Sequence, residues 1–288
     1  MKLHNEEAEI YFQEGDSLTQ ALQKTTHLAI AAHPDDLEIM ASSAILMCMQ
    51  ESDKYFAGVV VTDGRGSPRG GKYKNLSDAE MRLKRRVEQR KAAVVGEYLV
   101  LILLDYQSGA VKIIHSKDVI DDLTKILINC QPEIVYTHNL ADKHDTHIAV
   151  VLRTIQAIRG LPENYKPDRL IGCEIWRDLD WLLDEDKVVF DLSSQENLQL
   201  ALLGVFDSQI AGGKRYDLAA IGRRRAHGTF FESHDLTDTQ GLTFGMDLTP
   251  LIRDIKLDIS EYVGVYIKRF EKDVRDRIKK YESDIEED

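Results

Sequence analysis

Four short apolar runs, each followed by a helical pattern, constrain the fold of this 288-residue chain more than any other feature. The runs are continuous rather than alternating, as expected of strands buried on both faces of a sheet, and they span residues 27–32, 56–62, 98–104 and 133–138. Helical segments follow them at 35–50, 77–95, 116–130 and 145–160. This alternation predicts an α/β fold with a mostly parallel, Rossmann-like sheet and helices on both of its faces.

The pattern changes after residue 165 and predicts an elaborated C-terminal half. Further strands are expected at 170–177 and 188–193, and further helices near 195–210 and 214–227. An amphipathic helix follows at 261–284, and its apolar stripe packs either on the sheet or on another subunit of a homo-oligomer. Because no linker interrupts the chain, we expect a single domain over 1–288, with a core at about 25–210 and a C-terminal helical extension at about 255–288.

Composition narrows the class of partner and the compartment. A formal net charge of −12 disfavours nucleic acid or an anionic membrane as the main partner, because binding phosphates requires a basic surface. No segment approaches the roughly 18 apolar residues of a membrane span, and the N-terminal segment lacks the apolar stretch of a signal peptide. The three cysteines lack partners at metal-ligand spacing and are typical of small core residues in a reduced, cytoplasmic protein.

Histidines and carboxylates gather directly after the first and fourth predicted strands. The first cluster, AHPDD, supplies His33, Asp35 and Asp36, and the second, HNLADKHDTH, occupies 138–147. Ligands of open α/β sheets bind beyond the carboxyl ends of the strands, so the two clusters are expected to converge at one edge.

The residue types in these clusters suit a catalytic zinc site, which usually has three His or carboxylate ligands and one open position. His33, Asp36 and His147 would supply those ligands. The pKa of a water bound to zinc falls to about 7. Asp35 could accept the proton of that water, and His144 could stabilise an oxyanion or protonate a leaving amine.

Each cluster also has a simpler structural interpretation. Asp35 or Asp36 could cap the helix that follows them, and Asp142 could cap the helix that begins near 145. His144 and His147 could be a capping and a surface residue, whereas His138 at the end of a strand is more typical of a hydrogen-bonded support than of a ligand. The occurrence of both clusters at one sheet edge favours the metal site.

The motif AHPDD after a buried strand, with a later HxxH that opens a helix, resembles the PIG-L/LmbE family of zinc-dependent N-deacetylases. Three further segments resemble elements of the family's sequence pattern. They are 59–66 at the end of the second strand, 85–93 in the arginine-bearing helix and 207–210 later in the chain. The resemblance covers about the first 160 residues well and the remainder weakly. It implies a hydrolase that removes an N-acetyl group from N-acetylglucosamine-type sugars or sugar conjugates, which are small-molecule substrates.

Carried onto this chain, the resemblance implies zinc on His33, Asp36 and His147, although ferrous iron fits the same ligands. It also implies that Asp35 is the general base, that His144 is the oxyanion or acid residue, and that Arg85 lines the substrate site, with Arg86 as an alternative one residue later.

The chain departs from the family pattern at several positions. Ser42 and Ser43 replace paired glycines, and Asp207 stands where a histidine is expected. The aspartate that usually precedes the second histidine of HxxH is absent or displaced by one residue, so Asp142 or Asp145 must take its place if that residue orients a ligand. The departures leave the three ligands intact and leave the substrate open.

Two other functions compete with deacetylation. A non-catalytic, metal-containing sugar-binding module would need no carboxylate beside the ligands, so Asp35 argues against it. A phosphate-loop NTPase could use Gly66, Gly71 and Lys72, but Tyr73 replaces the required Ser or Thr.

Two further features allow both a functional and a purely structural interpretation. The cationic side chains of the 64–73 loop either bind an anionic part of the substrate or are exposed to solvent. The two tryptophans, Trp176 and Trp181, favour core packing over sugar stacking.

Overall fold

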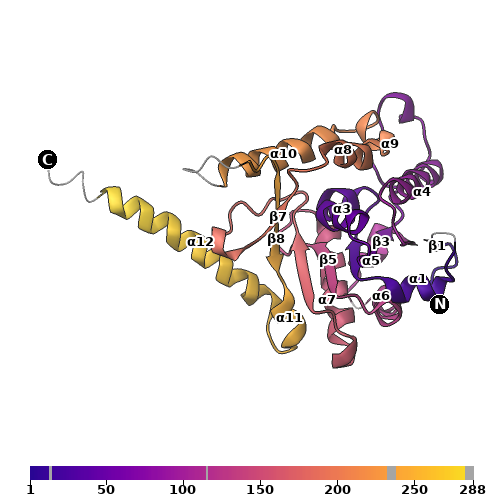
Figure 1. Cartoon of the computed structure of the whole chain (residues 1–288), viewed down its shortest axis with the longest axis horizontal. Coiled ribbons are helices and arrows are strands. Elements are labelled where there is room, and N and C mark those ends of the chain that lie inside the picture. Colours follow the sequence, from indigo (N-terminus) through magenta and orange to yellow (C-terminus); the bar gives the residue numbers. More distant parts are fainter. Residues whose placement is uncertain (13–14, 115, 232–237, 283–288) are drawn as a thin grey trace.

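The computed structural model describes residues 1–12, 15–114, 116–231 and 238–282, and its framework is one eight-stranded sheet (Figure 1). The spatial order of the strands is β1-β4-β3-β2-β5-β6-β8-β7. Their bounds are β1 Glu9–Phe12, β2 His27–Ala31, β3 Phe56–Thr62, β4 Val100–Tyr106, β5 Ile134–His138, β6 Arg169–Cys173, β7 Lys187–Asp191 and β8 Leu242–Asp247.

The sheet is mixed, with a parallel centre and antiparallel edges. The five strands from β4 to β6 pair in parallel, and four of them are the runs that define the sequence pattern. β1 joins β4 in the antiparallel direction, and β8 lies antiparallel to both β6 and β7. The expectation of a mostly parallel sheet therefore describes the centre. β1 and β8 were not predicted, because β1 is four residues long and β8 lies in the C-terminal half where no helix–strand alternation marks it.

Twelve α-helices are described. Their bounds are α1 Leu18–Lys24, α2 Asp36–Met40, α3 Ser42–Gln50, α4 Asp78–Val95, α5 Ser108–Lys112, α6 Lys117–Cys130, α7 Asp145–Arg159, α8 Glu196–Gly204, α9 Asp207–Ile210, α10 Tyr216–Phe230, α11 Thr249–Arg253 and α12 Ile259–Glu282. Three short 3₁₀ helices lie at η1 Gly71–Tyr73, η2 Glu163–Tyr165 and η3 Asp184–Asp186. The helix expected over 35–50 is two helices, because the backbone leaves helical geometry at Ala41 (φ −113°, ψ 19°).

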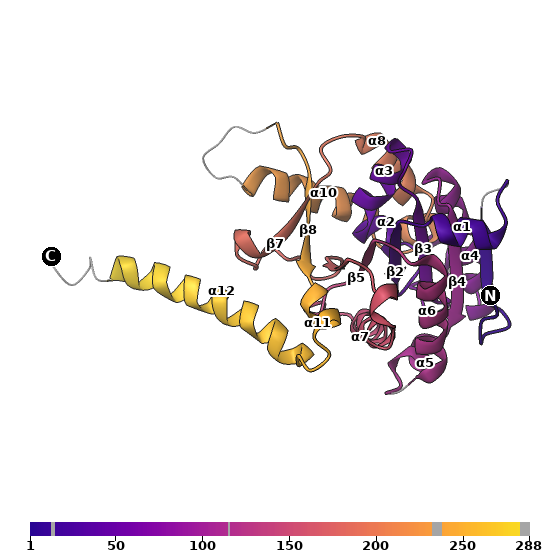
Figure 2. The ribbon, with the colours of Figure 1, turned by 60° about the horizontal axis from the view of Figure 1, so that its bottom comes forward.

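Apolar side chains pack on both faces of the sheet, as the continuous runs require. In β2, Leu28 and Ile30 join one buried cluster with α6 and α7, whereas Ala29 and Ala31 join a second with α2, α3 and α8. Figure 2 shows the helices on the two sides of the sheet. Since the helices cover both faces, the open edge formed by the carboxyl ends of the parallel strands is left for a site.

Helix α4 is the element that brings polar groups to this edge. It begins with the predicted capping box, in which Ser77 Oγ accepts from the backbone N–H of Glu80 and the Glu80 carboxylate accepts from the N–H of Ser77. Its buried face includes Arg85, Glu88 and Gln89, which recur at helical spacing where apolar residues would be usual. Buried polar side chains at such spacing need partners in the neighbouring elements.

Helix α12 extends away from the rest of the structure in both views (Figures 1 and 2). Its first turns are attached, since Val263 is buried and Tyr262 donates a hydrogen bond to the carbonyl oxygen of Asp247 at 2.5 Å. The distal stripe is exposed, with Val274 38% and Ile278 52% accessible. The expected extension runs to 288, and its last six residues lie outside the described ranges. No described helix is both long and apolar enough to cross a membrane.

Candidate functional site

A cavity of about 700 Å³ opens where β2 and β5 end. Side chains from the loops after these strands, from α4, from the segment after β6 and from α10 line it. His33, Asp35, Asp36, Arg85 and His144 are among the lining residues, and His147 lies buried behind them. The two clusters expected to converge therefore meet at this edge of the sheet.

Three donor atoms from these clusters form a nearly equilateral triangle, and we call His33, Asp36 and His147 the donor triad. His33 Nδ1 lies 3.2 Å from Asp36 Oδ2, and His147 Nε2 lies 3.3 Å from each of these atoms. The backbone N–H of His33 donates to Asp36 Oδ2 at 2.7 Å, which fixes that carboxylate at the start of α2. The first turn of α7 supplies His147.

The size of this triangle fits a tetrahedral zinc ion. Ligands bound at 2.0–2.1 Å in tetrahedral geometry are about 3.3–3.4 Å apart, close to the separations found here. The charges fit as well: burial alone would lower the pKa of His147, but Asp36 and Asp142 raise it to about 9. Two carboxylates that favour a proton on this ring would equally favour a metal cation beside it.

Asp142 and His138 support His147 from behind. Asp142 Oδ2 lies 3.1 Å from His147 Nδ1, and its Oδ1 accepts the backbone N–H groups of Lys143 and His144. The His138 ring stacks on that of His147 at 3.9 Å, while its Nε2 accepts the N–H of Ala32 at 2.8 Å. His138, Asp142 and His147 also lie close together, but Nε2 of His138 is already occupied, so the donor triad is the better cation site. Of the two aspartates considered for orienting a ligand, Asp142 holds that position.

Asp35 points its carboxylate at the cavity from a strained backbone position. Its φ of 88° is left-handed, which costs a non-glycine residue about 1–2 kcal/mol. Two side chains of α4 hold this conformation: Gln89 Oε1 accepts the backbone N–H of Asp35 at 3.1 Å, and Arg85 donates to the carbonyl oxygen of Pro34. Arg85 Nη2 also lies 3.1 Å from Asp35 Oδ1. The helix-cap interpretation of Asp35 fails, since its side chain caps no helix N–H group.

The two adjacent carboxyl groups have opposite pKa shifts. Burial raises the pKa of Asp35 to about 6, although the Arg85 guanidinium works against this. Asp36 is equally buried, but His147 and His33 hold its pKa well below the ordinary value. The neighbouring side chains therefore divide two identical groups into one that prefers charge and one that more readily takes up a proton.

A buried polar layer beneath Asp35 was not predicted. Gln89 Nε2 donates to Glu38 Oε1 at 2.7 Å, and the Tyr98 hydroxyl donates to the same oxygen at 2.6 Å. Burial raises the pKa of Glu38 to about 7, against the hydrogen bonds from Tyr98 and Gln89. Glu38 is fully buried and does not line the cavity, but Gln89 forms hydrogen bonds to both Glu38 and Asp35, and the charge of Asp35 also raises the pKa of Glu38. The one signal was the helical spacing that puts Arg85 and Gln89 on the same face of α4.

His144 lies over the donor triad. Its ring meets that of His33 edge-on at 5.0 Å and stacks on that of His147 at 4.6 Å. Burial, together with His147 and His33, lowers the pKa of His144 to about 4. Its Nδ1 is buried and has no partner among the described residues. A neutral ring with an unsatisfied nitrogen is thus held beside the cavity.

Arg85, not Arg86, lines the cavity. Arg86 turns away and pairs with Asp105 at 3.2 Å. Arg85 is almost fully buried, and its Nε and Nη1 atoms have no partner among the described residues. Gly64 makes room for it at a φ of +66°, because a Cβ there would lie 3.3 Å from Arg85 Nε. The DGRG segment after β3 therefore needs its first glycine.

Another side of the cavity is a wall that we call the α10 wall, formed by Trp176, Lys214, Tyr216 and Arg223. The sequence analysis considered Trp176 but favoured core packing for it, and it did not bring these four residues together. The Trp176 ring lies 6.0 Å from the His144 ring and meets Tyr216 edge-on at 6.1 Å. Trp176 thus lines the site as well as packing against the core, whereas Trp181 packs on the core. No motif marks this wall, because it is assembled from the irregular segment after β6, from α10 and from the residues just before α10.

The cationic side chains of the loop over 64–73 form ion pairs within the protein. Arg65 pairs with Asp63, Arg69 with Asp78, and Lys72 with Asp207 at 2.6 Å. Tyr73 also donates to Asp207, so this aspartate ties the loop to α9. Asp207 does not line the cavity, although Gln209 of the same helix does. With Lys72 engaged in this way, the arrangement does not favour a phosphate-binding loop.

Ser42, one of the departures from the family pattern, also has a partner. Its Oγ lies 2.6 Å from Nη2 of Arg224, which is buried and also donates to the carbonyl oxygens of Glu38 and Ile39. Arg224 therefore joins α10 to the end of α2.

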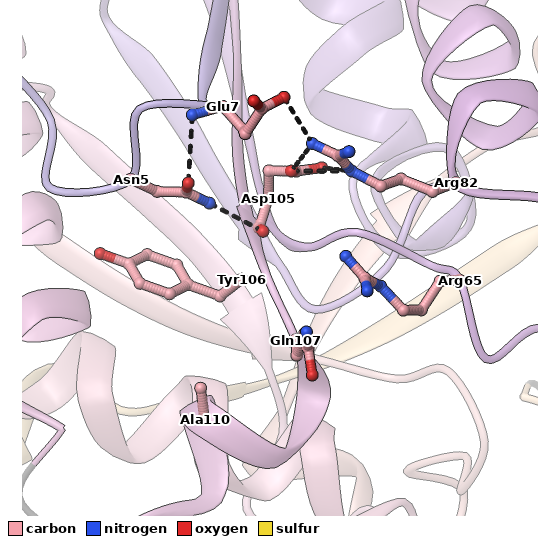
Figure 3. Close-up of a pocket in the computed structure, with 8 residues that line it drawn as sticks. All are labelled: Asn5, Glu7, Arg65, Arg82, Asp105, Tyr106, Gln107 and Ala110. Carbon is pink, nitrogen blue, oxygen red and sulfur yellow. Dashed lines mark hydrogen bonds and ion pairs between the residues drawn. The ribbon is translucent and has the colours of Figure 1, made fainter. Parts of the chain in front are cut away.

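A second, smaller cavity of about 330 Å³ lies at the end of β4 (Figure 3). Its charged groups satisfy one another: Arg82 pairs with Asp105 and Glu7, and Asn5 Nδ2 donates to the carbonyl oxygen of Asp105 at 2.8 Å. It holds no group of the donor triad, so the larger cavity is the candidate site.

Known structures with this fold have different enzymatic activities. The N,N'-diacetylchitobiose deacetylase from Pyrococcus horikoshii superposes with a TM-score of 0.62 at 18% identity, over 85% of this chain and 97% of that one. GalB, the 4-carboxy-2-hydroxymuconate hydratase from Pseudomonas putida KT2440, gives a TM-score of 0.61 at 19% identity, over 78% and 97%. At such identities the likeness shows the fold alone, and a hydratase uses it too.

Sequence comparison gives the family. The model described as PIG-L, GlcNAc-PI de-N-acetylase, matches residues 28–158, which contain both clusters. The "Uncharacterized deacetylase YaiS" of Escherichia coli (strain K12) is 30% identical over 151 residues, covering 51% of this chain and 75% of that protein. With the two histidine and aspartate clusters meeting at the sheet edge as well, the chain belongs to the PIG-L family.

Proposed function

We propose that this protein is a divalent-metal-dependent deacetylase that hydrolyses the acetamide of an N-acetylglucosamine-type sugar or sugar conjugate. The observation that carries the proposal is the donor triad, whose separations of 3.2–3.3 Å match a tetrahedral zinc site, beside the carboxylate of Asp35. Membership of the PIG-L family supports the same activity. Zinc is the metal that these ligands favour, and ferrous iron fits them as well.

His33, Asp36 and His147 would hold the metal. When bound, the metal would polarise the acetamide carbonyl and acidify a water molecule. Asp142 would keep His147 in the tautomer that presents Nε2, through its contact with Nδ1.

Asp35 would move the proton. Its Oδ1 is paired with Arg85, which leaves Oδ2 to accept a proton from the attacking water and return it to the nitrogen of the departing amine. The left-handed backbone held by Gln89 and Arg85 aims the carboxylate at this task. His144 would donate a hydrogen bond to the oxygen of the tetrahedral intermediate, because its neutral ring lies over the donor triad. Acetate and a free amine leave.

The experiment measures acetate release from a panel of N-acetylated amino sugars, with metal content determined on the same samples. Asp35→Asn and His147→Ala are compared with the wild type, and Gln156→Ala, on the exposed side of α7, is the control. We expect about one metal per wild-type chain and acetate release. Asp35→Asn should keep the metal and lose turnover by roughly 10²–10⁴-fold, and His147→Ala should lose both.

The proposal fails if the wild type binds no metal after reconstitution with zinc or ferrous iron. Stoichiometric metal without release of acetate from any sugar would favour the non-catalytic binding module. Asp35→Asn turning over like the wild type would remove the general base from the mechanism.

A further inference from the structure

The larger cavity is cationic in a chain whose net charge is −12. Five cationic side chains line it, against two carboxylates that belong to the reaction centre, Asp35 and Asp36; the five are Arg85, Lys112, Lys214, Arg215 and Arg223. Such an excess of positive charge in a cavity attracts an anionic ligand, because the low-dielectric walls strengthen the local field.

Three of these cations are free to meet a ligand. Arg85 is engaged by Asp35, and Arg215 forms a two-point contact with Asp217 at 2.7–2.9 Å. Among the residues that the structure describes, Lys112, Lys214 and Arg223 form no ion pair. The cations of the 64–73 loop, in contrast, are all paired with carboxylates.

Lys214 and Arg223 sit together with Trp176. Lys214 Nζ lies 5.0 Å from the centre of the Trp176 ring. Arg223 donates one N–H from Nη1 to the carbonyl oxygen of Ile175, the residue before Trp176, which anchors its guanidinium beside the same segment. Trp176 in turn lies 6.0 Å from the His144 ring, so the two cations are one side chain removed from the proposed oxyanion residue.

We infer that Trp176, Lys214 and Arg223 form a subsite for an anionic group, a phosphate or a carboxylate, carried by the acetylated sugar. The inference rests on the proposed deacetylation, since it assigns the part of the substrate that does not react. The aromatic face would pack on the sugar or its attachment, and the ammonium and guanidinium groups would bind the anion. All three residues lie outside the segment 28–158 that the family model matches.

The test compares kcat and KM for neutral and anionic substrates. N-acetylglucosamine and its methyl glycoside are the neutral probes. N-acetylglucosamine 1-phosphate and 6-phosphate supply a phosphate at two positions, and N-acetylmuramic acid supplies a carboxylate. We expect at least one anionic probe to have a KM roughly tenfold below that of the neutral sugars, and the preferred probe distinguishes phosphate from carboxylate.

Lys214→Gln and Arg223→Gln should each remove most of this preference, because they should raise KM for the anionic probe much more than KM for the neutral sugars. Lys268→Gln is the matched control, because Lys268 is an exposed lysine of α12 that does not line the cavity. Equal KM values for neutral and anionic probes in the wild type would overturn the inference. So would a preference that survives in the double variant, because the anion would then bind elsewhere.

Calorimetry separates this inference from the proposed function. Glucosamine 6-phosphate and 1-phosphate are titrated into the wild type and into the double variant, with glucosamine as the neutral reference. If no sugar releases acetate, the proposed function has failed, while tighter phosphate binding that the double variant loses would still support the subsite. Binding of phosphate to a metal would be equal in both proteins, so equal affinities would reject the subsite.

Discussion

The two sides of the cavity differ in how their side chains are held. The donor triad and Asp35 are almost fully enclosed, apart from His33: His147 is 0%, Asp36 4% and Asp35 9% exposed, and each has at least two polar contacts. The α10 wall is partly open to solvent, and Lys214 and Arg223 lack carboxylate partners among the described residues. Enclosed groups with fixed partners suit a reaction that needs exact geometry, whereas open, unpaired charges suit selection of a ligand.

The largest effect should come from adding or removing the metal that we propose for the donor triad. We expect zinc to raise the midpoint of thermal unfolding by about 4–5 °C at a hundredfold excess over Kd, because binding to the folded state alone adds about 2.7 kcal/mol. Differential scanning calorimetry with and without chelator measures this. His147→Ala should abolish the shift and Lys214→Gln should preserve it. A shift of equal size in both variants would show that the metal binds elsewhere, and the donor triad would then not differ from the α10 wall in the way described above.

The next largest effect is expected when Asp142, which contacts His147 from behind the donor triad, is replaced. Asp142→Asn keeps the shape of the side chain but removes the charge that favours Nε2 of His147 as a ligand. We expect metal affinity to fall by about 10–100-fold, measured by competition with a coloured chelator. Asp145→Asn, in the same segment, is the control, because Asp145 is exposed and, among the described residues, forms no hydrogen bond or ion pair with the side chains of the donor triad. Unchanged affinity in Asp142→Asn would mean that Asp142 only shapes the loop.

Gln89→Ala should have a smaller effect, which lowers turnover and stability but leaves metal binding and substrate binding intact. The variant removes the acceptor for the backbone N–H of Asp35 and one donor to Glu38. We expect kcat to fall roughly tenfold and the unfolding free energy to drop by about 1–3 kcal/mol, with full metal content and unchanged KM. Steady-state kinetics measures kcat and KM, metal analysis gives the metal content, and urea unfolding gives the free energy of unfolding. A rise in KM with constant kcat would assign Gln89 to substrate binding instead.

The smallest effect is expected for Trp176→Leu in the α10 wall. The substitution keeps apolar contact with the second core cluster but removes the aromatic face beside Lys214. KM for a preferred substrate should rise by about threefold to tenfold, since a cation–π or stacking contact contributes about 0.5–1.5 kcal/mol. Metal content and kcat should not change. Loss of metal in this variant would show that wall and triad are not separate units.

The contrast between the two sides also explains what the sequence could predict. His33 and Asp36 directly follow a strand, and His147 opens a helix after another, so the rule for parallel sheets brings them together without further information. Asp142 was one of two candidates, and only the fold distinguishes it. Gln89 depends on a register between α4 and the AHPDD turn, and Arg223 reaches the segment of Trp176 only because α10 packs beside the irregular chain that follows β6. Contacts of this kind follow from tertiary structure and leave no local pattern.

The left-handed backbone of Asp35 limits which residues can occupy that position over evolutionary time. Glycine adopts this conformation freely, and aspartate and asparagine adopt it more readily than other residues that carry a side chain. Among these three, only aspartate carries a carboxylate. The fold therefore restricts this position to a few residues, and the proposed chemistry selects aspartate among them. A related protein that had lost catalysis would no longer need the carboxylate, but its backbone at this position would still have to be left-handed. Asparagine or glycine, rather than alanine, would be the substitution that marks such a protein.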